Sequence, residues 1–234
     1  MTMRPLIVAI DGPAGAGKST VSKLLARRLG LSFVDTGALY RTVALSARRQ
    51  NIAPDDDAAL GALLPRINIA FRAVGEENRV YLDGEDVSTA IRTPEMSLLA
   101  SAVSARPVVR SGLLGLQRRL ALEAPVGAVL EGRDIGTVVF PDADLKFFLE
   151  ANPDVRARRR YEELFQKGSE SSLDAVLADQ TKRDRDDSSR AVAPLKPADD
   201  AVKVDTSGLP LSEVVQTLER LIRQRLAGRR TPPA

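Results

Sequence analysis

The segment at residues 12–19 constrains the possible folds of this chain more than any other segment. It reads Gly-Pro-Ala-Gly-Ala-Gly-Lys-Ser and fits the pattern G-x-x-x-x-G-K-[ST]. Residues 6–10 before it form a continuous apolar run, which is typical of a buried parallel strand. Over residues 18–29 apolar side chains recur at helical spacing. A buried strand, a glycine-rich loop and a helix in this order predict a loop that wraps the phosphates of a nucleoside triphosphate.

The residue types in this loop suit phosphate binding. Glycines let backbone N–H groups point inward and approach the phosphates closely, and the positive end of the following helix faces the same anions. We expect Lys18 to reach the β- and γ-phosphates and Ser19 to ligate Mg²⁺. The residues predicted to bind the nucleotide are Gly12, Pro13, Ala14, Gly15, Ala16, Gly17, Lys18, Ser19 and Thr20.

The pattern of apolar residues along the rest of the chain predicts an α/β fold, with a five-stranded parallel sheet that carries helices on both faces. Ligands of such sheets bind at the carboxyl ends of the strands. Alternating residues and an Asp83-Gly84 turn predict a small antiparallel insert at about 66–88. We expect further strands at 33–35, 128–131, 145–149 and 201–205, and helices at about 38–48, 94–104, 107–124, 153–166, 171–187 and 211–226.

The composition excludes several kinds of site. The 234 residues include neither cysteine nor histidine, which excludes disulfides, a His/Cys zinc site, a cysteine nucleophile and a histidine base. Any metal must then be a hard cation held by oxygen, such as Mg²⁺. The sequence has no apolar stretch long enough to span a bilayer and no usual signal peptide, so we expect a cytoplasmic protein.

Arginines cluster at 106–119, 156–160 and 183–190, although the net charge is only +3. Nucleic-acid binding is one interpretation of these clusters. Against it, aromatic residues make up only 4% of the chain and do not interleave with the arginines as a stacking platform requires. Guanidinium groups that face a small polyphosphate fit as well, although any single arginine could be an ordinary solvated surface residue.

The phosphate loop alone does not separate kinases from other nucleotide-binding proteins. A GTPase needs an Asn-Lys-x-Asp stretch, which the sequence lacks. The strand expected at 128–131 leads into Gly132-Arg133-Asp134, which suits a substrate-facing turn better than a mechanical ATPase. Residues 35–41 follow the second expected strand, and Thr36 is expected to cap the helix that begins there. Tyr40 could simply pack on the core, whereas Arg41 is harder to explain by packing.

These motifs together resemble those of the bacterial cytidylate kinases. The similarity covers residues 12–20, 35–41, 131–137, 182–195 and 205–207 in this order, and extends to about residue 226. The resemblance implies the P-loop nucleoside monophosphate kinase fold. It divides the chain into a core (1–64, 106–152 and 188–227), a CMP-binding insert (65–105), a helical lid (153–187) and a frayed tail (228–234). The lid is expected to close over the phosphates, with its flexible tip at 168–172.

The resemblance also implies roles for individual residues. Thr36, Tyr40 and Arg41 would line the CMP site; Ser101, Arg110 and Asp134 would read the cytosine; Arg41, Arg133 and Arg190 would hold the acceptor phosphate; and Arg183 and Asp187 would contact the sugar or its phosphate. Arg156, Arg159 and Arg160 would lie in or near the lid, and the catalytic set would be Lys18, Arg133, Arg159 and Arg160. Glu131, where many members have aspartate, would orient a magnesium-bound water.

General chemistry agrees with this interpretation. A phosphate acceptor has a second pKa of about 6 and is largely ionised at neutral pH, so it needs no general base. A chain without histidine can therefore carry out the reaction. Two anions must meet, and Mg²⁺, Lys18 and several arginines can cancel their charge. We expect ATP as the donor, Mg²⁺ as the cofactor and CMP or dCMP as the acceptor, with no nucleic-acid or membrane partner and a monomeric chain.

Two other functions stay open at this point. One is a kinase of the same fold that acts on UMP or on a hydroxyl group, for which Asp35 could serve as the base. The other is an ATP-dependent nucleic-acid-binding protein, which would bind oligonucleotides in a salt-sensitive manner. ADP release with a series of acceptors separates all three.

Overall fold

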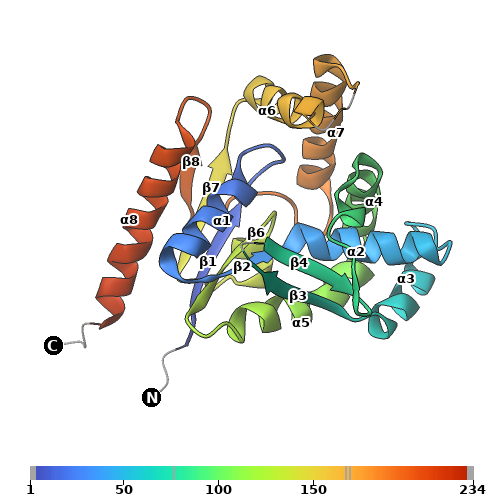
Figure 1. Cartoon of the computed structure of the whole chain (residues 1–234), viewed down its shortest axis with the longest axis horizontal. Coiled ribbons are helices and arrows are strands. Elements are labelled where there is room, and N and C mark those ends of the chain that lie inside the picture. Colours follow the sequence, from blue (N-terminus) through green and yellow to red (C-terminus); the bar gives the residue numbers. More distant parts are fainter. Residues whose placement is uncertain (1–3, 76, 167, 169, 231–234) are drawn as a thin grey trace. The chain divides into compact units, whose positions relative to one another are not determined.

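The computed structural model describes residues 4–75, 77–166, 168 and 170–230. Within these residues five strands form one sheet in the order β2-β6-β1-β7-β8 (Figure 1). The pairs β1–β6, β1–β7 and β7–β8 are parallel. The expected doubly wound α/β class is confirmed. The strands of this sheet are β1 (Leu6–Asp11), β2 (Ser32–Asp35), β6 (Gly127–Gly132), β7 (Leu145–Glu150) and β8 (Val202–Asp205).

The helices agree closely with the periodicity of the sequence. The α-helices are α1 (Lys18–Leu29), α2 (Thr36–Arg49), α3 (Asp57–Leu63), α4 (Pro94–Ser104), α5 (Pro107–Leu122), α6 (Pro153–Gln166), α7 (Leu173–Ser189) and α8 (Leu211–Arg230). Shorter turns are η1 (Leu64–Arg66), η2 (Ala90–Arg92) and η3 (Ile135–Val139), the last a single π-helical turn. Helix α8 continues to Arg230, past the expected end at residue 226, and residues 231–234 of the expected tail lie outside the described part of the chain.

Contacts divide the chain into two compact units, one of Met1–Val34 with Ala121–Ala234 and one of Asp35–Leu120. We call them the phosphate-loop unit and the insert unit. The core of the phosphate-loop unit forms where α1 and α8 cover one face of the sheet. Leu6, Val8 and Ile10 face this core because alternate residues of a strand point the same way. All six residues of β1 are buried, so the sheet is covered on both faces here.

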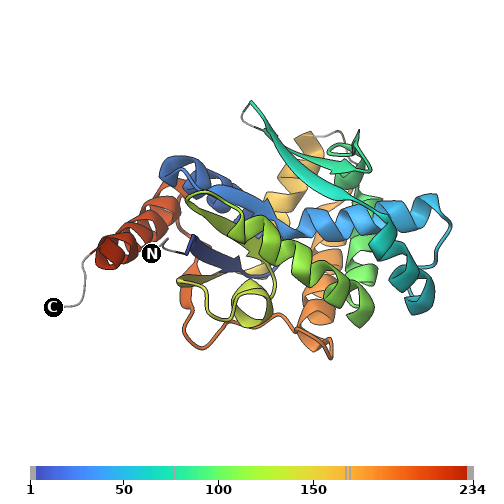
Figure 2. The same cartoon turned by 90° about the horizontal axis from the view of Figure 1, so that it is seen from below.

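The insert unit has a hydrophobic core of its own. Its β-structure is an antiparallel sheet of β3 (Ile69–Val74), β4 (Glu77–Leu82) and β5 (Glu85–Asp86), in which β3 and β4 form a hairpin (Figure 2). Apolar residues of α2, α4 and α5 pack with Ile69, Val80 and Leu82 of this sheet. The antiparallel insert expected at about 66–88 is therefore present. The division into core, insert and lid with the boundaries given above stays a prediction.

One local expectation is wrong. Thr36 does not cap α2; it is the first residue of the helix and is 3% exposed. The cap residue is Asp35, whose Oδ1 accepts a hydrogen bond from the backbone N–H of Ala38 at 2.8 Å. Aspartate and threonine are both good cap residues, and the sequence alone did not reveal which of these neighbours has the extended backbone of a cap.

Candidate active site

The phosphate loop leads from β1 into α1 as the motif predicts. The Lys18 side chain is 6% exposed and its Nζ donates to the carbonyl of Pro13 at 2.6 Å, so it curls back over the loop. Burial, and then the charge of Arg133, hold the pKa of Lys18 below its usual range, while Glu131 opposes them. A bound polyphosphate would supply the negative charge that this buried ammonium group needs.

Ser19 and Glu131 lie together although 112 residues separate them. The Ser19 hydroxyl donates to Oε2 of Glu131 at 2.8 Å. Strand β6 pairs with β1, and this pairing brings the end of β6 to the phosphate loop. A hydroxyl and a carboxylate are hard oxygen donors, so this pair fits Mg²⁺ in company with nucleotide phosphates. Among the described residues no group of three or more acidic side chains could hold a metal without the nucleotide.

A cluster of buried charges lies on the turn after β6 and at the end of α7. Arg133 Nε donates to Asp187 Oδ2 at 2.7 Å, and Arg190 NH1 lies 3.6 Å from Asp187 Oδ1. Burial works to raise the pKa of Asp187, but Arg133, Arg183 and Arg190 together hold it below its usual value. We call Arg133, Asp187 and Arg190 the Asp187 cluster. It joins three residues that the sequence predicted separately, and its two guanidinium groups share a single carboxylate.

Helices α6 and α7 contact the phosphate loop through polar groups. The Arg156 side chain is 5% exposed; it donates to the carbonyl of Ala14 at 3.0 Å and pairs with Asp184 of α7. Gly15 has φ +77°, and a Cβ there would lie 3.0 Å from both Arg156 Cβ and Gln180 Nε2. The loop therefore needs glycine at this position for two reasons, its backbone angle and the close approach of α6 and α7.

The other two arginines of α6 have different partners. Arg159 donates to the carbonyl of Thr206 at 2.6 Å, and the Thr206 hydroxyl donates to the carbonyl of Ala16 at 3.3 Å. Arg160 pairs with Glu163 on its own helix. The structure thus connects Arg156 and Arg159 with the phosphate loop, the second through Thr206. Within the expected tip at 168–172, Ser169 lies outside the described residues, as does Lys167 just before it.

Three of the predicted CMP contacts in the insert unit, Tyr40, Arg41 and Arg110, have identified side-chain partners. Arg41 NH2 lies 3.0 Å from Asp35 Oδ2, so the carboxylate that caps α2 also holds this arginine. The Arg110 guanidinium is 8% exposed and stacks on Tyr40, with Cζ 5.5 Å from the ring centroid. Arg110 also donates to the carbonyl of Ser104 at 3.0 Å. Tyr40 belongs to the hydrophobic core of the unit, and Ser101 is half-buried on α4.

Some residues of these sites escaped sequence reasoning. Asp11, Gln180 and Asp184 had no expected role, and Thr206 was noted only as part of a motif. Asp11 carried a possible signal, because it is an acidic residue at the end of an apolar strand and directly before the loop. The partners of the other three become visible only in three dimensions.

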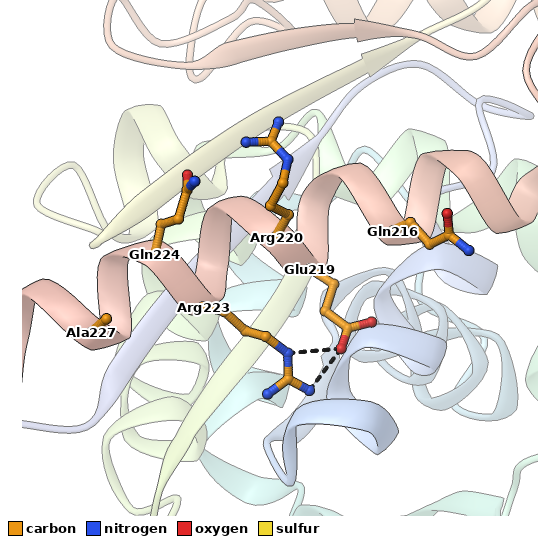
Figure 3. Close-up of a pocket in the computed structure, with 6 residues that line it drawn as sticks. All are labelled: Gln216, Glu219, Arg220, Arg223, Gln224 and Ala227. Atoms are coloured by element: carbon orange, nitrogen blue, oxygen red, sulfur yellow. Dashed lines mark hydrogen bonds and ion pairs between the residues drawn. The ribbon is translucent and has the colours of Figure 1, made fainter.

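A shallow hollow lies along α8 (Figure 3). All of its lining residues come from this one helix, and Glu219 is bonded within it to Arg223. Such a row of side chains is a helix surface and not a concave site. Separately, among the described helices none combines the length and apolar character of a membrane span.

Comparisons with known proteins place the chain in a family. The family model described as cytidylate kinase matches residues 8–224. The cytidylate kinase of Geobacter sulfurreducens is 57% identical over 231 residues, which are 99% of this chain and 97% of that protein. The cytidylate kinase of Mycobacterium leprae is 49% identical over 95% of this chain and 98% of its own length.

Solved structures support the fold alone. A gluconokinase from Sinorhizobium meliloti matches with a TM-score of 0.50 and 15% sequence identity, over 97% of this chain and 98% of that chain. The resemblance inferred from the motifs is confirmed by the much higher identities to the curated relatives: this chain belongs to the cytidylate kinase family.

Proposed function

We propose that this chain transfers the γ-phosphoryl group of ATP to CMP, giving ADP and CDP, and that it also accepts dCMP. The observation that carries the proposal is the Asp187 cluster, which holds two partly buried guanidinium groups in the same unit as Lys18. Two anions must meet in this reaction, and fixed positive charge lowers the cost of their approach. The names of the curated relatives support CMP as the acceptor.

The residues present fit a reaction without a general base. The attacking oxygen belongs to a phosphate that is already largely ionised at neutral pH. Lys18 neutralises the β- and γ-phosphates. Arg133 and Arg190 bind the acceptor phosphate, either in place of the Asp187 carboxylate or together with it. Ser19 and Glu131 would hold Mg²⁺, which when bound supplies further positive charge between the phosphates.

The remaining predicted contacts keep their roles in this proposal. Asp134 accepts from the exocyclic amine of cytosine, a donor that uracil lacks. In the insert unit, Arg110 donates to the ring nitrogen and carbonyl of cytosine, which are acceptors, and Ser101 also reads the base. Thr36, Tyr40 and Arg41 line the CMP site, and Arg41 contributes to phosphate binding. Residues 153–187 act as the lid over the phosphates. The enzyme is expected to be monomeric and cytoplasmic.

The structure disfavours the alternative of a hydroxyl acceptor with Asp35 as base. The Asp35 carboxylate caps α2 and pairs with Arg41, so both of its oxygens are engaged with positive or donor groups. Neither oxygen could accept a proton from an acceptor hydroxyl without giving up one of these partners.

A series of acceptors tests the proposal. ADP release is measured with ATP, Mg²⁺ and, in turn, CMP, dCMP, UMP, AMP, GMP and cytidine. We expect turnover to be highest with CMP, substantial with dCMP, at least about tenfold lower with UMP, and absent with cytidine, whose only acceptors are hydroxyl groups. Turnover of cytidine at the rate of CMP would contradict a phosphate acceptor. ATPase activity that depends on oligonucleotides and not on CMP would instead favour the nucleic-acid-binding alternative.

A further inference from the structure

Asp11 is a buried acidic residue to which the proposed reaction gives no role. It is the last residue of β1, directly before the phosphate loop, and it is 4% exposed. The five residues before it in the strand are apolar and equally buried. Burying a carboxylate costs free energy unless it is hydrogen-bonded, so the hydrogen-bond partners of Asp11 should indicate its role.

Both oxygens of Asp11 accept hydrogen bonds from one short segment. Oδ1 accepts from the backbone N–H of Ile135 at 2.8 Å, and Oδ2 from that of Gly136 at 2.7 Å. These are the first two amides of η3, and such amides have no acceptor within their own helix. The cap therefore comes from Asp11, more than 120 residues away, and not from Asp134, the N-cap residue of η3.

The segment that Asp11 holds continues directly from the proposed acceptor residues. Arg133, which pairs with Asp187, and Asp134 immediately precede the two amides. Lys146 and Asp11 both pack closely against Gly136, because a Cβ there would lie 3.1 Å from Lys146 Cδ and 3.4 Å from Asp11 Oδ2. Fixing the amides of residues 135 and 136 therefore restricts the backbone positions of residues 133 and 134.

We propose that Asp11 is a positioning residue for the acceptor side of the reaction: its carboxylate clamps the turn at residues 132–136, which carries Arg133 and Asp134, to the strand that ends in the phosphate loop. One strand then sets the position of the donor loop and of the acceptor turn together. Misplacement of a reacting group by about 1 Å can cost about 100-fold in rate. The proposal deepens the proposed function and rests on it.

The clamp requires a carboxylate. The two N–H groups each bond a different oxygen of Asp11, whereas an asparagine offers one oxygen and one NH₂ group at these two places. In Asp11→Asn one of the two amides would face another donor, and the turn would have to move away. We expect the KM for CMP to rise about tenfold or more, while the KM for ATP changes less than about twofold, because the backbone of the phosphate loop keeps its strand and helix.

Asp144 provides a matched control at the other end of β1. Its Oδ2 accepts from the backbone N–H of Ile7 at 2.8 Å, and its side chain is 2% exposed. Asp144→Asn therefore replaces a carboxylate that bonds the same strand, and breaks its ion pair with Arg4, without touching the turn. We expect it to leave both KM values unchanged, whatever it does to the melting temperature.

Two further measurements keep the test decisive. Hydrogen exchange of the amides of Ile135 and Gly136 should be slow in the wild type, and at least one of them should exchange faster in Asp11→Asn. In Gly136→Ala the added methyl group would crowd the Lys146 side chain at 3.1 Å and lie against Asp11 Oδ2 at 3.4 Å; the shift of the turn that relieves the crowding should raise the KM for CMP selectively as well. If Asp11→Asn does not fold, Gly136→Ala decides the question by this selective change.

The outcomes separate the clamp from the proposed function. A wild-type enzyme that does not phosphorylate CMP would contradict the proposed function and the clamp with it. The clamp alone would be overturned by another result: the wild type phosphorylates CMP, but Asp11→Asn and Gly136→Ala leave the KM for CMP unchanged or change both KM values equally. Fast exchange of both amides in the wild type would overturn it as well.

Discussion

Two of the buried aspartates of the phosphate-loop unit, Asp11 and Asp187, lie in different surroundings. Asp11 at the end of β1 accepts from two backbone N–H groups, and Asp187 at the end of α7 pairs with Arg133 and lies near Arg190. Their exposures are almost equal, 4% and 5%. Burial nevertheless raises the pKa of Asp11 to about 6 despite its amides. The pKa of Asp187 falls below its usual value because the arginines outweigh burial.

The difference shows what each region is built for. Neutral amide dipoles orient a carboxylate without cancelling its charge, so Asp11 gives a fixed backbone geometry at an electrostatic cost. Guanidinium groups cancel the charge, so the Asp187 cluster is a set of cations that holds one anion and can hold another. We infer that Asp11 builds the frame of the site and that the Asp187 cluster binds its ligand. The predictions below test this contrast, from the largest expected effect to the smallest.

Lys18→Ala should have the largest effect. Lys18 is the phosphate-loop cation, and loss of one preorganised charge of this kind costs about 10²- to 10³-fold in kcat. The fold should persist, because within the described part of the chain the Nζ of Lys18 donates only to a carbonyl of its own loop. ADP release measures the loss, and circular dichroism checks the fold. Near-normal turnover would mean that the phosphate-loop assignment is wrong.

Asp187→Asn should destabilise the free protein by about 3 kcal/mol, because it leaves buried guanidinium groups without their carboxylate. If the cluster can exchange one anion for another, CMP or inorganic phosphate should restore much of this loss. Thermal melts with and without each anion measure the effect. If CMP raises the melting temperature of the variant no more than that of the wild type, the cluster is a purely structural ion pair and the contrast with Asp11 is wrong.

The pH dependence of stability should reveal Asp11. Its pKa is about 6 in the folded chain, against 3.8 for an aspartate in water. Between these values the folded chain binds more protons than the unfolded chain, so the stability due to this group falls as pH rises. The two pKa values correspond to a fall of about 2 kcal/mol from pH 4 to pH 7.

Denaturant titrations at several pH values can isolate this contribution as the difference between wild type and Asp11→Asn. Asp187 contributes with the opposite sign, because its lowered pKa makes stability fall as pH decreases toward the folded-state pKa. If the difference in free energy of unfolding between wild type and Asp11→Asn does not change from pH 4 to pH 7, the charged form of Asp11 does not destabilise the folded chain.

Asp134→Ala should change selectivity by a smaller amount. Its carboxylate is proposed to accept from the cytosine amine, and its loss should lower the preference for CMP over UMP about tenfold, or about 1.4 kcal/mol. Competition between CMP and UMP for the same enzyme measures this ratio directly. An unchanged ratio would assign base recognition to other residues, while leaving the clamp by Asp11 intact.

Much of this fold could be predicted from the sequence, because the information is local. The helical spacing after the phosphate loop predicted both ends of α1 correctly. The expected bounds of α4 and α6 also agree with the structure. The cap of α2 was assigned to the wrong neighbour, since Thr36 and Asp35 are chemically similar caps. Motifs matched to the family supplied Arg133, Asp187 and Arg190 individually, but not their arrangement around one carboxylate.

The contacts that the sequence did not reveal are those that depend on the order of the strands. Ser19 meets Glu131, and Asp11 meets Gly136, because β6 lies beside β1 with the register Asp11↔Gly132. More than a hundred residues separate these partners, and no periodicity carries information about such a pairing.

The most direct test of the central claim compares CMP with cytidine as ligands of two proteins. Isothermal titration calorimetry is performed on the wild type and on Arg133→Ala, with cytidine reporting whether the base site survives the substitution. If Arg133 holds the acceptor phosphate, the affinity for CMP should fall about 100-fold, or about 3 kcal/mol for a charge-assisted contact, while the affinity for cytidine stays the same. Equal loss of affinity for both ligands, or no loss for either, would contradict the assignment of the Asp187 cluster to the acceptor phosphate.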